Sequence, residues 1–380
     1  MLQCVLKCVD SYRRELRQPP IDPRRVVCLD DSIGKVEGAL ILIFEADPQF
    51  PILIAKAAPQ QRARRREGQP LYQIEYDNLE ALETSGLNLS HRTTPAPLVR
   101  WQEAGLLITL QSALRGPLLK NIPARRLLSA RQLATTLESV FGWWQRFEEC
   151  LGLERRGLDD PTYREQVLGP VESFQQRFVT DQDERGFLQR RFEDLRSLAG
   201  RELPFTVQHG DFCPANIVLQ PEGIGVFDWE LPLRRQLPLF DLFHFFASVR
   251  YPFHGLRGES SHYRSFLEVF WGQNYFSRAL RHYLDRFCSL LAIERDLVAD
   301  LFLLSLIRIA NLKYQALLEI HGSNREPSGG APDSEQKLRS LWQQVGGADQ
   351  DVPFARIQSG VFQNLRHVVR HGLPDFLQRK

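Results

Sequence analysis

Residues 206–230 read TVQHGDFCPANIVLQPEGIGVFDWE, and this stretch decides how the rest of the chain is interpreted. Short apolar runs follow one another with polar loops between them, which is typical of short strands joined by turns. Asp211, Asn216 and Asp228 each stand where an apolar run meets a loop. Because loops at strand ends present binding and catalytic side chains on a rigid scaffold, the pattern predicts a site at these three acceptor groups.

The spacing of these three residues favours phosphoryl transfer. An Asp followed five positions later by an Asn, and then by a second Asp after another strand, matches the catalytic and metal-binding loops of kinases. That chemistry needs a carboxylate to orient and deprotonate the attacking hydroxyl, and oxygen ligands to hold Mg²⁺ on the nucleotide phosphates. We therefore expect Asp211 to be the base and Asn216 and Asp228 to be the metal ligands. Ordinary turn residues are the alternative interpretation.

The motif HGDFCPAN at 209–216, followed by a hydrophobic strand and DWE at 228–230, resembles the aminoglycoside phosphotransferase family. That family is a branch of the protein-kinase-like superfamily and includes choline and fructosamine kinases. Its typical loop reads HGDLHPGN, so Phe212, Cys213 and Ala215 are departures, although they fall between the reactive positions.

Three other residues near the loop are secondary candidates. The segment PLFDL at 238–242 resembles the P-x-x-D-L segment of the family, and the resemblance implies a structural role for Asp241. His209 opens the catalytic motif. Glu230 follows Asp228 by two positions and is expected to face either the metal site or the acceptor.

Upstream, short apolar runs at 26–29, 39–44 and 52–56 predict three strands, which is how the N-terminal lobe of a kinase begins. The loop between the first two contains Gly34, and its backbone N–H groups are expected to approach phosphates. It lacks a full G-x-G-x-x-G motif, and the alternative interpretation, an ordinary hairpin turn, fits the sequence equally well.

Lys56 ends the third strand in the sequence LIAK, similar to the VAIK of kinases. Its ammonium would bridge the α- and β-phosphates as a compact charge. Residues 70–85 have apolar residues at helical spacing, and Glu75 lies within that apolar face. A carboxylate there needs a cation, so we expect an ion pair between Lys56 and Glu75. A lysine pointing into water is the alternative.

The adenine site is expected at a strand over 106–110 and at the hinge that follows it. Backbone groups of Gln111, Ser112 and Ala113 would meet the adenine edge, whereas Ala55 and Val218 would form walls of the pocket. The alternative interpretation is that Ala55 and Val218 are ordinary residues of the hydrophobic core.

Downstream features favour a small-molecule acceptor. Asp241 follows Asp228 closely, so the long activation segment and the APE motif of protein kinases do not fit between them. The pair His209-Gly210 also replaces the arginine of the kinase HRD motif. Periodic patterns predict helices over 117–200, with a break at 155–161, and over 241–320. A Gly/Ser/Pro-rich stretch predicts a mobile loop at 321–336.

Composition limits the remaining functions. The 380 residues carry a formal net charge of +2, which gives no global electrostatic case for nucleic acid. No apolar run approaches the length of a membrane span, so a membrane partner is not expected. The six cysteines form no CxxC pair, and a cytoplasmic location is expected. The oligomeric state stays open.

These observations predict an α+β, bilobal protein-kinase-like fold with a small β-rich N-terminal lobe and a larger, mainly helical C-terminal lobe. The expected divisions are an extension at 1–24, a nucleotide-binding lobe at 25–113 and a helical lobe at 114–380. The resemblance implies an enzyme that moves the γ-phosphoryl group of ATP, with Mg²⁺, to a hydroxyl of an aminoglycoside, sugar or amino-alcohol type acceptor. The alternatives are an inactive kinase-fold protein that binds a nucleotide or a partner, a protein kinase and an adenylyl transferase.

Overall fold

The computed structural model of the chain describes residues 1–30, 38–45, 47–60, 65–66, 69–88, 92–121, 130–178, 182–231, 233–249, 259–322, 364–368 and 371–377. The chain divides into two compact units. The first unit combines 1–121, 137–150 and 215–233, and the second combines 122–136, 151–214 and 234–380. The catalytic motif therefore crosses from the second unit into the first.

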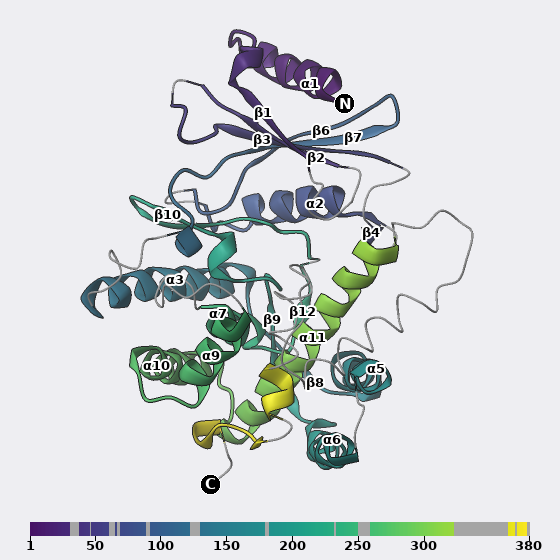
Figure 1. Cartoon of the computed structure of the whole chain (residues 1–380), viewed down its shortest axis with the longest axis vertical. Helices are drawn as coiled ribbons and strands as arrows, with labels where there is room; N and C mark the ends of the chain where they lie inside the picture. The colour runs from purple at the N-terminus through teal and green to yellow at the C-terminus, as the bar shows by residue number, and fades with distance from the viewer. Residues whose placement is uncertain are drawn as a thin grey trace. The chain divides into compact units, whose positions relative to one another are not determined.

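The first unit is built on a five-stranded antiparallel sheet (Figure 1). Its strands are β1 (Val26–Asp30), β2 (Ala39–Ile43), β3 (Leu53–Pro59), β6 (Pro97–Glu103) and β7 (Leu106–Ser112). The order across the sheet is β1-β2-β3-β7-β6. The predicted strands at 26–29, 39–44, 52–56 and 106–110 are confirmed.

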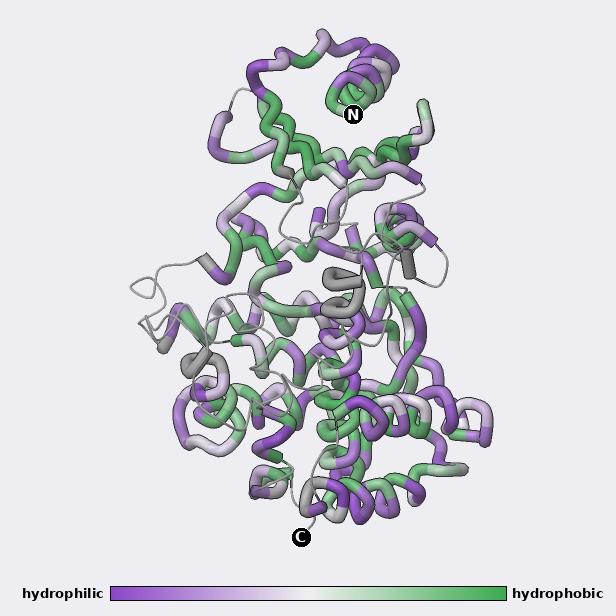
Figure 2. Tube along the Cα trace, turned by 45° about the vertical axis from the view of Figure 1, so that its right-hand side comes forward, coloured by the Kyte–Doolittle hydropathy of each residue, from purple (hydrophilic) through white to green (hydrophobic). Residues whose placement is uncertain are grey.

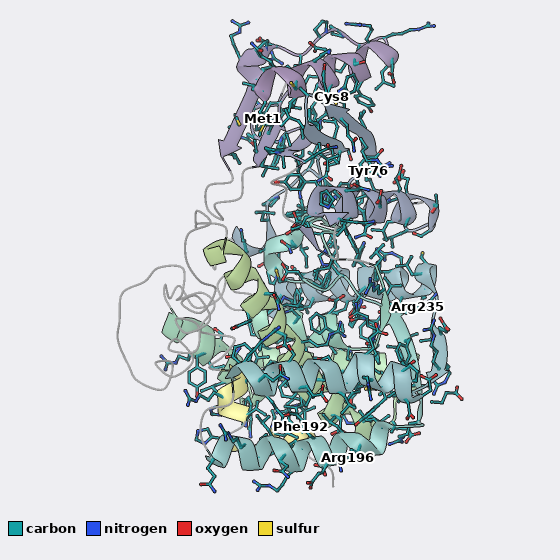
Figure 3. All side chains as sticks on the ribbon, turned by 90° about the vertical axis from the view of Figure 1, so that its right-hand side faces the viewer. Met1, Cys8, Tyr76, Phe192, Arg196 and Arg235 are labelled. Atoms are coloured by element: carbon teal, nitrogen blue, oxygen red, sulfur yellow. The ribbon has the colours of Figure 1, made fainter. Side chains whose placement is uncertain are left out.

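Helices cover both faces of this sheet. The first is α1 (Leu2–Glu15), which buries Val5, Cys8 and Val9 against it, and Figure 3 labels Cys8 on the side of α1 turned to the strands. Hydrophobic residues concentrate in the strands under α1, while the outer side of the helix is hydrophilic (Figure 2). The helix α2 (Leu71–Thr84) packs against β6 and β7 and confirms the helix predicted over 70–85. One face of the sheet is therefore covered by α1 and the other by α2.

The hairpin of β10 (Ile217–Gln220) and β11 (Gly223–Val226) also belongs to the first unit. The chain leaving β7 runs against it: the Leu219 N–H donates to the carbonyl of Pro117 at 2.9 Å. Gly116 has φ of +139°, and a Cβ there would lie 1.9 Å from the Leu219 carbonyl oxygen. Only glycine allows this close approach.

The second unit is mainly helical, with a small sheet of β8 (Glu154–Gly157), β9 (Glu202–Val207) and β12 (Arg235–Gln236). Its helices are α4 (Asp160–Tyr163), α5 (Gly169–Phe178), α6 (Gln182–Leu195), α7 (Phe240–Ser248), α9 (Glu259–Phe270), α10 (Tyr275–Leu290) and α11 (Val298–Gly322). The helix α11 packs against α5 and α7 (Figure 1). Within the described residues these helices confirm the predicted helical regions, and β8 overlaps the break predicted at 155–161.

Shorter elements complete the fold. The helix α3 (Ala130–Leu151) contributes its 137–150 part to the first unit, where Trp143 and Phe147 pack on Trp229. Minor strands and short helical turns are β4 (Arg65–Arg66), β5 (Gln69–Pro70), Pro23–Arg25, Leu119–Asn121, Arg164–Leu168, Arg196–Leu198, Pro214–Asn216, Arg295–Leu297 and Asp375–Leu377. Within the described residues, no helix combines the length and apolar character needed to cross a bilayer.

The predicted α+β fold class is confirmed: the N-terminal region forms a β-sheet and the C-terminal region is mainly helical. Two predictions fall on parts of the chain outside the description. Gly34 and its loop lie outside the described residues. Of the loop predicted at 321–336, residues 321 and 322 end α11, and the rest lies outside the described residues.

Candidate active site

In the first unit, the ammonium of Lys56 meets three carboxylates. Its Nζ lies 2.5 Å from Oε2 of Glu75, 3.4 Å from Oε1 of Glu230 and 3.8 Å from Oδ1 of Asp228. The Lys56 side chain is 13% exposed and the Glu75 side chain 1%. One buried cation therefore joins β3, α2 and the segment that follows β11.

This environment fixes the charge of Lys56. Burial opposes an ammonium, but the carboxylates of Glu75, Glu230 and Asp228 outweigh burial and hold the pKa of Lys56 well above its ordinary value. Burial raises the pKa of Glu75, while Lys56 acts in the opposite direction. Lys56 therefore stays a cation, which is the form that a phosphate-binding lysine needs.

The helix α2 orients this cluster at two positions one turn apart. Glu75 pairs with Lys56, and Asn78, also buried, faces the segment after β11. The Asn78 amide donates to the carbonyls of Trp229 at 2.7 Å and Leu231 at 2.8 Å. The same helix thus holds the lysine and the backbone that carries Asp228. The sequence analysis did not identify Asn78, although its position three residues after Glu75 places it near that face.

Asn216 and Asp228 flank the same end of the β10–β11 hairpin. Ile217 pairs with Val226, and the Phe227 N–H donates to the carbonyl of Asn216 at 3.1 Å. Asp228 has φ of +72°, a left-handed conformation that is uncommon outside glycine and typical of functional sites. An amide oxygen and a carboxylate are the hard oxygen donors that Mg²⁺ prefers. The residues present therefore fit a magnesium ion.

The structure corrects the predicted role of Ala55. Side chains alternate across a strand, so Ala55 and Lys56 point to opposite faces of β3. Ala55 is fully buried in the core that includes residues of α1. Ile54, two positions before Lys56, shares the lysine's face and is partly exposed. The prediction from position alone was off by one residue, because a shift of one reverses the face of a strand.

The expected hinge begins later than the sequence indicated. Gln111 and Ser112 are still part of β7, and Gln111 lies opposite Ile54. The N–H groups of Ser112 and Ala113 donate to the carbonyls of Ala96 and Ile52, each at 2.9 Å. These N–H groups are therefore already engaged by the protein.

Val218 lies on β10, beside the chain that leaves β7. It is 5% exposed and pairs with Leu118 in an isolated bridge. This position is compatible with both a pocket wall and plain core.

In the second unit, Asp241 fixes the start of the catalytic motif. Its fully buried carboxylate accepts hydrogen bonds from the N–H groups of His209 at 2.6 Å and Gly210 at 2.9 Å. Gly210 has φ of +84°, which glycine adopts without strain. His209 Nδ1 in turn accepts from the N–H of Asp211 at 3.2 Å. These contacts make Asp241 and His209 supports of the loop and leave Asp211 as its outward carboxylate.

Two cationic or donor groups converge on Oδ1 of Asp211. Nε2 of His244 lies 2.9 Å away, and the ammonium of Lys313 lies 3.6 Å away. Burial alone would raise the pKa of Asp211, but Lys313 and His244 outweigh burial and hold that pKa well below its usual range. Asp211 is therefore ionised at neutral pH, as a general base must be.

Neither His244 nor Lys313 was predicted from the sequence. His244 stands three positions after Asp241 on α7, its ring stacked on that of Phe240. Lys313 lies on α11, far along the chain from Asp211. A histidine in the run of phenylalanines at 240–246 was a visible signal for the first, whereas no local pattern marks the second.

The chain is similar in sequence to a known family of proteins. The sequence model of the phosphotransferase enzyme family matches residues 60–264, which is more than half of the chain. The protein therefore belongs to the phosphotransferase enzyme family, and the resemblance noted in the catalytic motif is confirmed. No functionally curated protein matches the chain by sequence.

Solved structures that resemble this chain include three small-molecule kinases. An aminoglycoside phosphotransferase from Streptomyces rimosus is 17% identical, with 76% of this chain and 92% of that chain covered and a TM-score of 0.45. A choline kinase from Cryptosporidium parvum is 11% identical, with 90% and 95% covered and a TM-score of 0.48. A glucosamine kinase bound to glucosamine, ADP and phosphate is 18% identical, with 85% and 82% covered and a TM-score of 0.46.

Proposed function

We propose that this protein is an ATP-dependent kinase that transfers the γ-phosphoryl group to a hydroxyl of a small molecule. The observation that carries the proposal is the enclosure of the Lys56 ammonium by Glu75, Glu230 and Asp228. A structural protein has no need of three carboxylates around one buried cation. A nucleotide-binding protein does, because the lysine must stay charged and fixed until phosphates arrive.

The roles in the first unit follow from side-chain chemistry. Lys56, held by Glu75, grips the phosphates. Asn216 and Asp228 hold Mg²⁺, which when bound neutralises charge on the transferring phosphoryl group. Ile54 replaces Ala55 as the expected wall of the adenine site, with Val218 as the other wall.

Asp211 is the proposed base, and its chemistry suits the role. Its low pKa keeps the carboxylate ionised, so it can orient the acceptor hydroxyl and accept its proton as the phosphoryl group moves. Asp211 and Asn216 are five residues apart, so an extended chain would separate their Cα atoms by at most about 18 Å.

The test begins with nucleotide binding. Calorimetric titration of ATP, with and without Mg²⁺, is compared between the natural protein and Asp228→Ala. We expect Mg²⁺-dependent binding that is at least about tenfold weaker in the variant, which corresponds to about 1.4 kcal/mol. No binding by the natural protein would contradict the proposal and favour a partner-binding protein.

The second step separates binding from turnover. Hydroxyl compounds of the sugar, aminoglycoside and amino-alcohol classes are screened for transfer of labelled phosphate from ATP. We expect Asp211→Ala to abolish transfer and to leave ATP affinity nearly unchanged, since Asp211 binds neither the nucleotide nor the metal. Full transfer by Asp211→Ala would refute the assignment of the base. The mass of the product distinguishes phosphoryl transfer from adenylyl transfer.

A further inference from the structure

Asp211, Cys213 and His244 bring three different donor groups together in the second unit. One carboxylate oxygen, the Sγ atom and one ring nitrogen all lie within 4.8 Å of one another. His244 is buried, and the other two side chains are half-buried. Cys213 stands two positions after Asp211 in the catalytic motif, at one of the positions where this chain departs from HGDLHPGN.

This donor set differs in kind from that of the magnesium ligands. Sulfur, nitrogen and oxygen together suit a borderline metal ion such as Zn²⁺, whereas Mg²⁺ takes oxygen ligands. Zinc sites with three protein ligands leave a fourth position for water. Metal bonds of about 2.0–2.3 Å place donor atoms roughly 3–4 Å apart, so these side chains need to close by only about 1 Å.

We propose that Asp211, Cys213 and His244 form a binding site for Zn²⁺ or a similar thiophilic divalent ion, and that the bound ion blocks the base. The metal site stands on the cluster itself. Its consequence for catalysis rests on the proposed function, because an ion on the Asp211 carboxylate withdraws the electron pair that accepts the hydroxyl proton. Occupancy would stop phosphoryl transfer without disturbing the nucleotide site.

Two features of the cluster predict that metal binding is weak and reversible. The Lys313 ammonium lies 3.6 Å from Oδ1 of Asp211, and its side chain is 34% exposed. A metal ion must repel this ammonium, which can turn into water. His244 Nδ1 is buried and has no hydrogen-bond partner in the described structure, although metal-bound histidines usually donate from the second nitrogen. The affinity is therefore expected to be lower than that of a structural zinc site.

A change at Lys313 tests the proposal because the direction of the change in metal affinity is predicted. Lys313→Gln removes the positive charge and keeps a polar side chain of similar reach. Because like charges beside a metal weaken its binding, Lys313→Gln should bind the ion more tightly than the natural protein. Cys213→Ser should bind the ion at least about tenfold more weakly, because a hydroxyl is a poorer ligand than a thiolate for a borderline metal ion. These two opposite changes are hard to obtain from adventitious binding.

The probe is Co²⁺, because its absorption spectrum shows whether a thiolate binds it. Reduced, full-length protein without nucleotide is titrated with Co²⁺ while the thiolate-to-cobalt absorption band is recorded, and Zn²⁺ is then added to displace it. We expect the band in the natural protein, its loss in Cys213→Ser and an unchanged band in Cys150→Ser. Cys150 is the matched control because it is an exposed thiol on α3, outside the cluster.

The outcomes separate the site from the kinase assignment. No band, or a band that survives in Cys213→Ser, overturns the site; His244→Gln provides a second variant if Cys213→Ser unfolds. In the transfer assay with excess Mg²⁺, Zn²⁺ should inhibit the natural protein and Cys150→Ser, but inhibit Cys213→Ser much less, and a zinc-selective chelator should restore activity. Equal inhibition of all three overturns the blocking role. If no acceptor is ever phosphorylated, the proposed function fails while the cobalt spectrum still decides the metal site.

Discussion

Nε2 of His244 lies 2.9 Å from Oδ1 of Asp211 and ties the catalytic motif to α7. The same helix begins with Asp241, whose carboxylate accepts from the N–H groups of His209 and Gly210. One helix therefore holds both the backbone of the motif and the carboxylate that the motif presents. Nδ1 of His244 is buried and has no hydrogen-bond partner in the described structure, so Nε2 makes the hydrogen bond of this ring.

This contact predicts that His244 positions the base. His244→Leu removes the donor, so kcat should fall by up to about 100-fold, the order of loss that misplacement of a catalytic group by about 1 Å produces. KM for ATP should stay nearly constant. His244→Gln keeps an N–H donor of similar reach and should recover most of kcat. Steady-state kinetics of both variants check this, and equal losses in the two would contradict a role through the hydrogen bond.

The ion pair of Lys56 and Glu75 predicts a strong coupling in stability. Lys56→Met leaves the Glu75 carboxylate buried without its cation, which typically costs about 3–5 kcal/mol. Glu75→Leu in the same chain removes that stranded charge, so the double variant should be more stable than Lys56→Met alone. Urea unfolding of the two single variants and the double variant measures the coupling. Additive losses would show that the two side chains act independently.

The sequence predicted those site residues that can be recognised from their immediate neighbours in the chain. Lys56 at the end of an apolar strand and Glu75 in an apolar helical stripe required each other, because a buried carboxylate needs a cation. The motif 209–216 and Asp228 were visible because short strands place polar residues at their ends. Each of these inferences used neighbouring residues only.

The remaining parts depend on which distant elements meet. Lys313 reaches Asp211 because α11 packs against α7, and helix packing leaves no local mark in the sequence. Ala55 was misassigned because the motif LIAK does not show which face of β3 is covered by α1. The role of residues 1–24 was likewise unreadable until α1 proved to be the cover of that face.

His367 predicts a pH dependence of stability in the second unit. Burial and the nearby His371 lower the pKa of His367 to about 4, from an ordinary value of about 6.5. A histidine with a depressed folded pKa favours the folded state only when neutral, so stability should fall as pH drops from about 6.5 toward 4. Nδ1 of His367 also pairs with the Tyr263 hydroxyl at 2.6 Å. Thermal unfolding between pH 7 and 4 tests this; His367→Gln should flatten the profile, and an unchanged profile would contradict it.

Asn78 predicts a loss of nucleotide affinity without any contact to the nucleotide. Its amide donates to the carbonyls of Trp229 and Leu231, on either side of Glu230 and just after Asp228. Asn78→Asp is isosteric but cannot donate, so two backbone carbonyls lose their partner, at about 1–3 kcal/mol each if both stay buried. The segment should shift, and calorimetry should show weaker Mg²⁺-dependent ATP binding. Glu80→Gln on the exposed side of α2 is the control and should leave affinity unchanged. If Asn78→Asp unfolds less readily than expected and binds ATP as the natural protein does, the segment holds Asp228 in place by its own conformation.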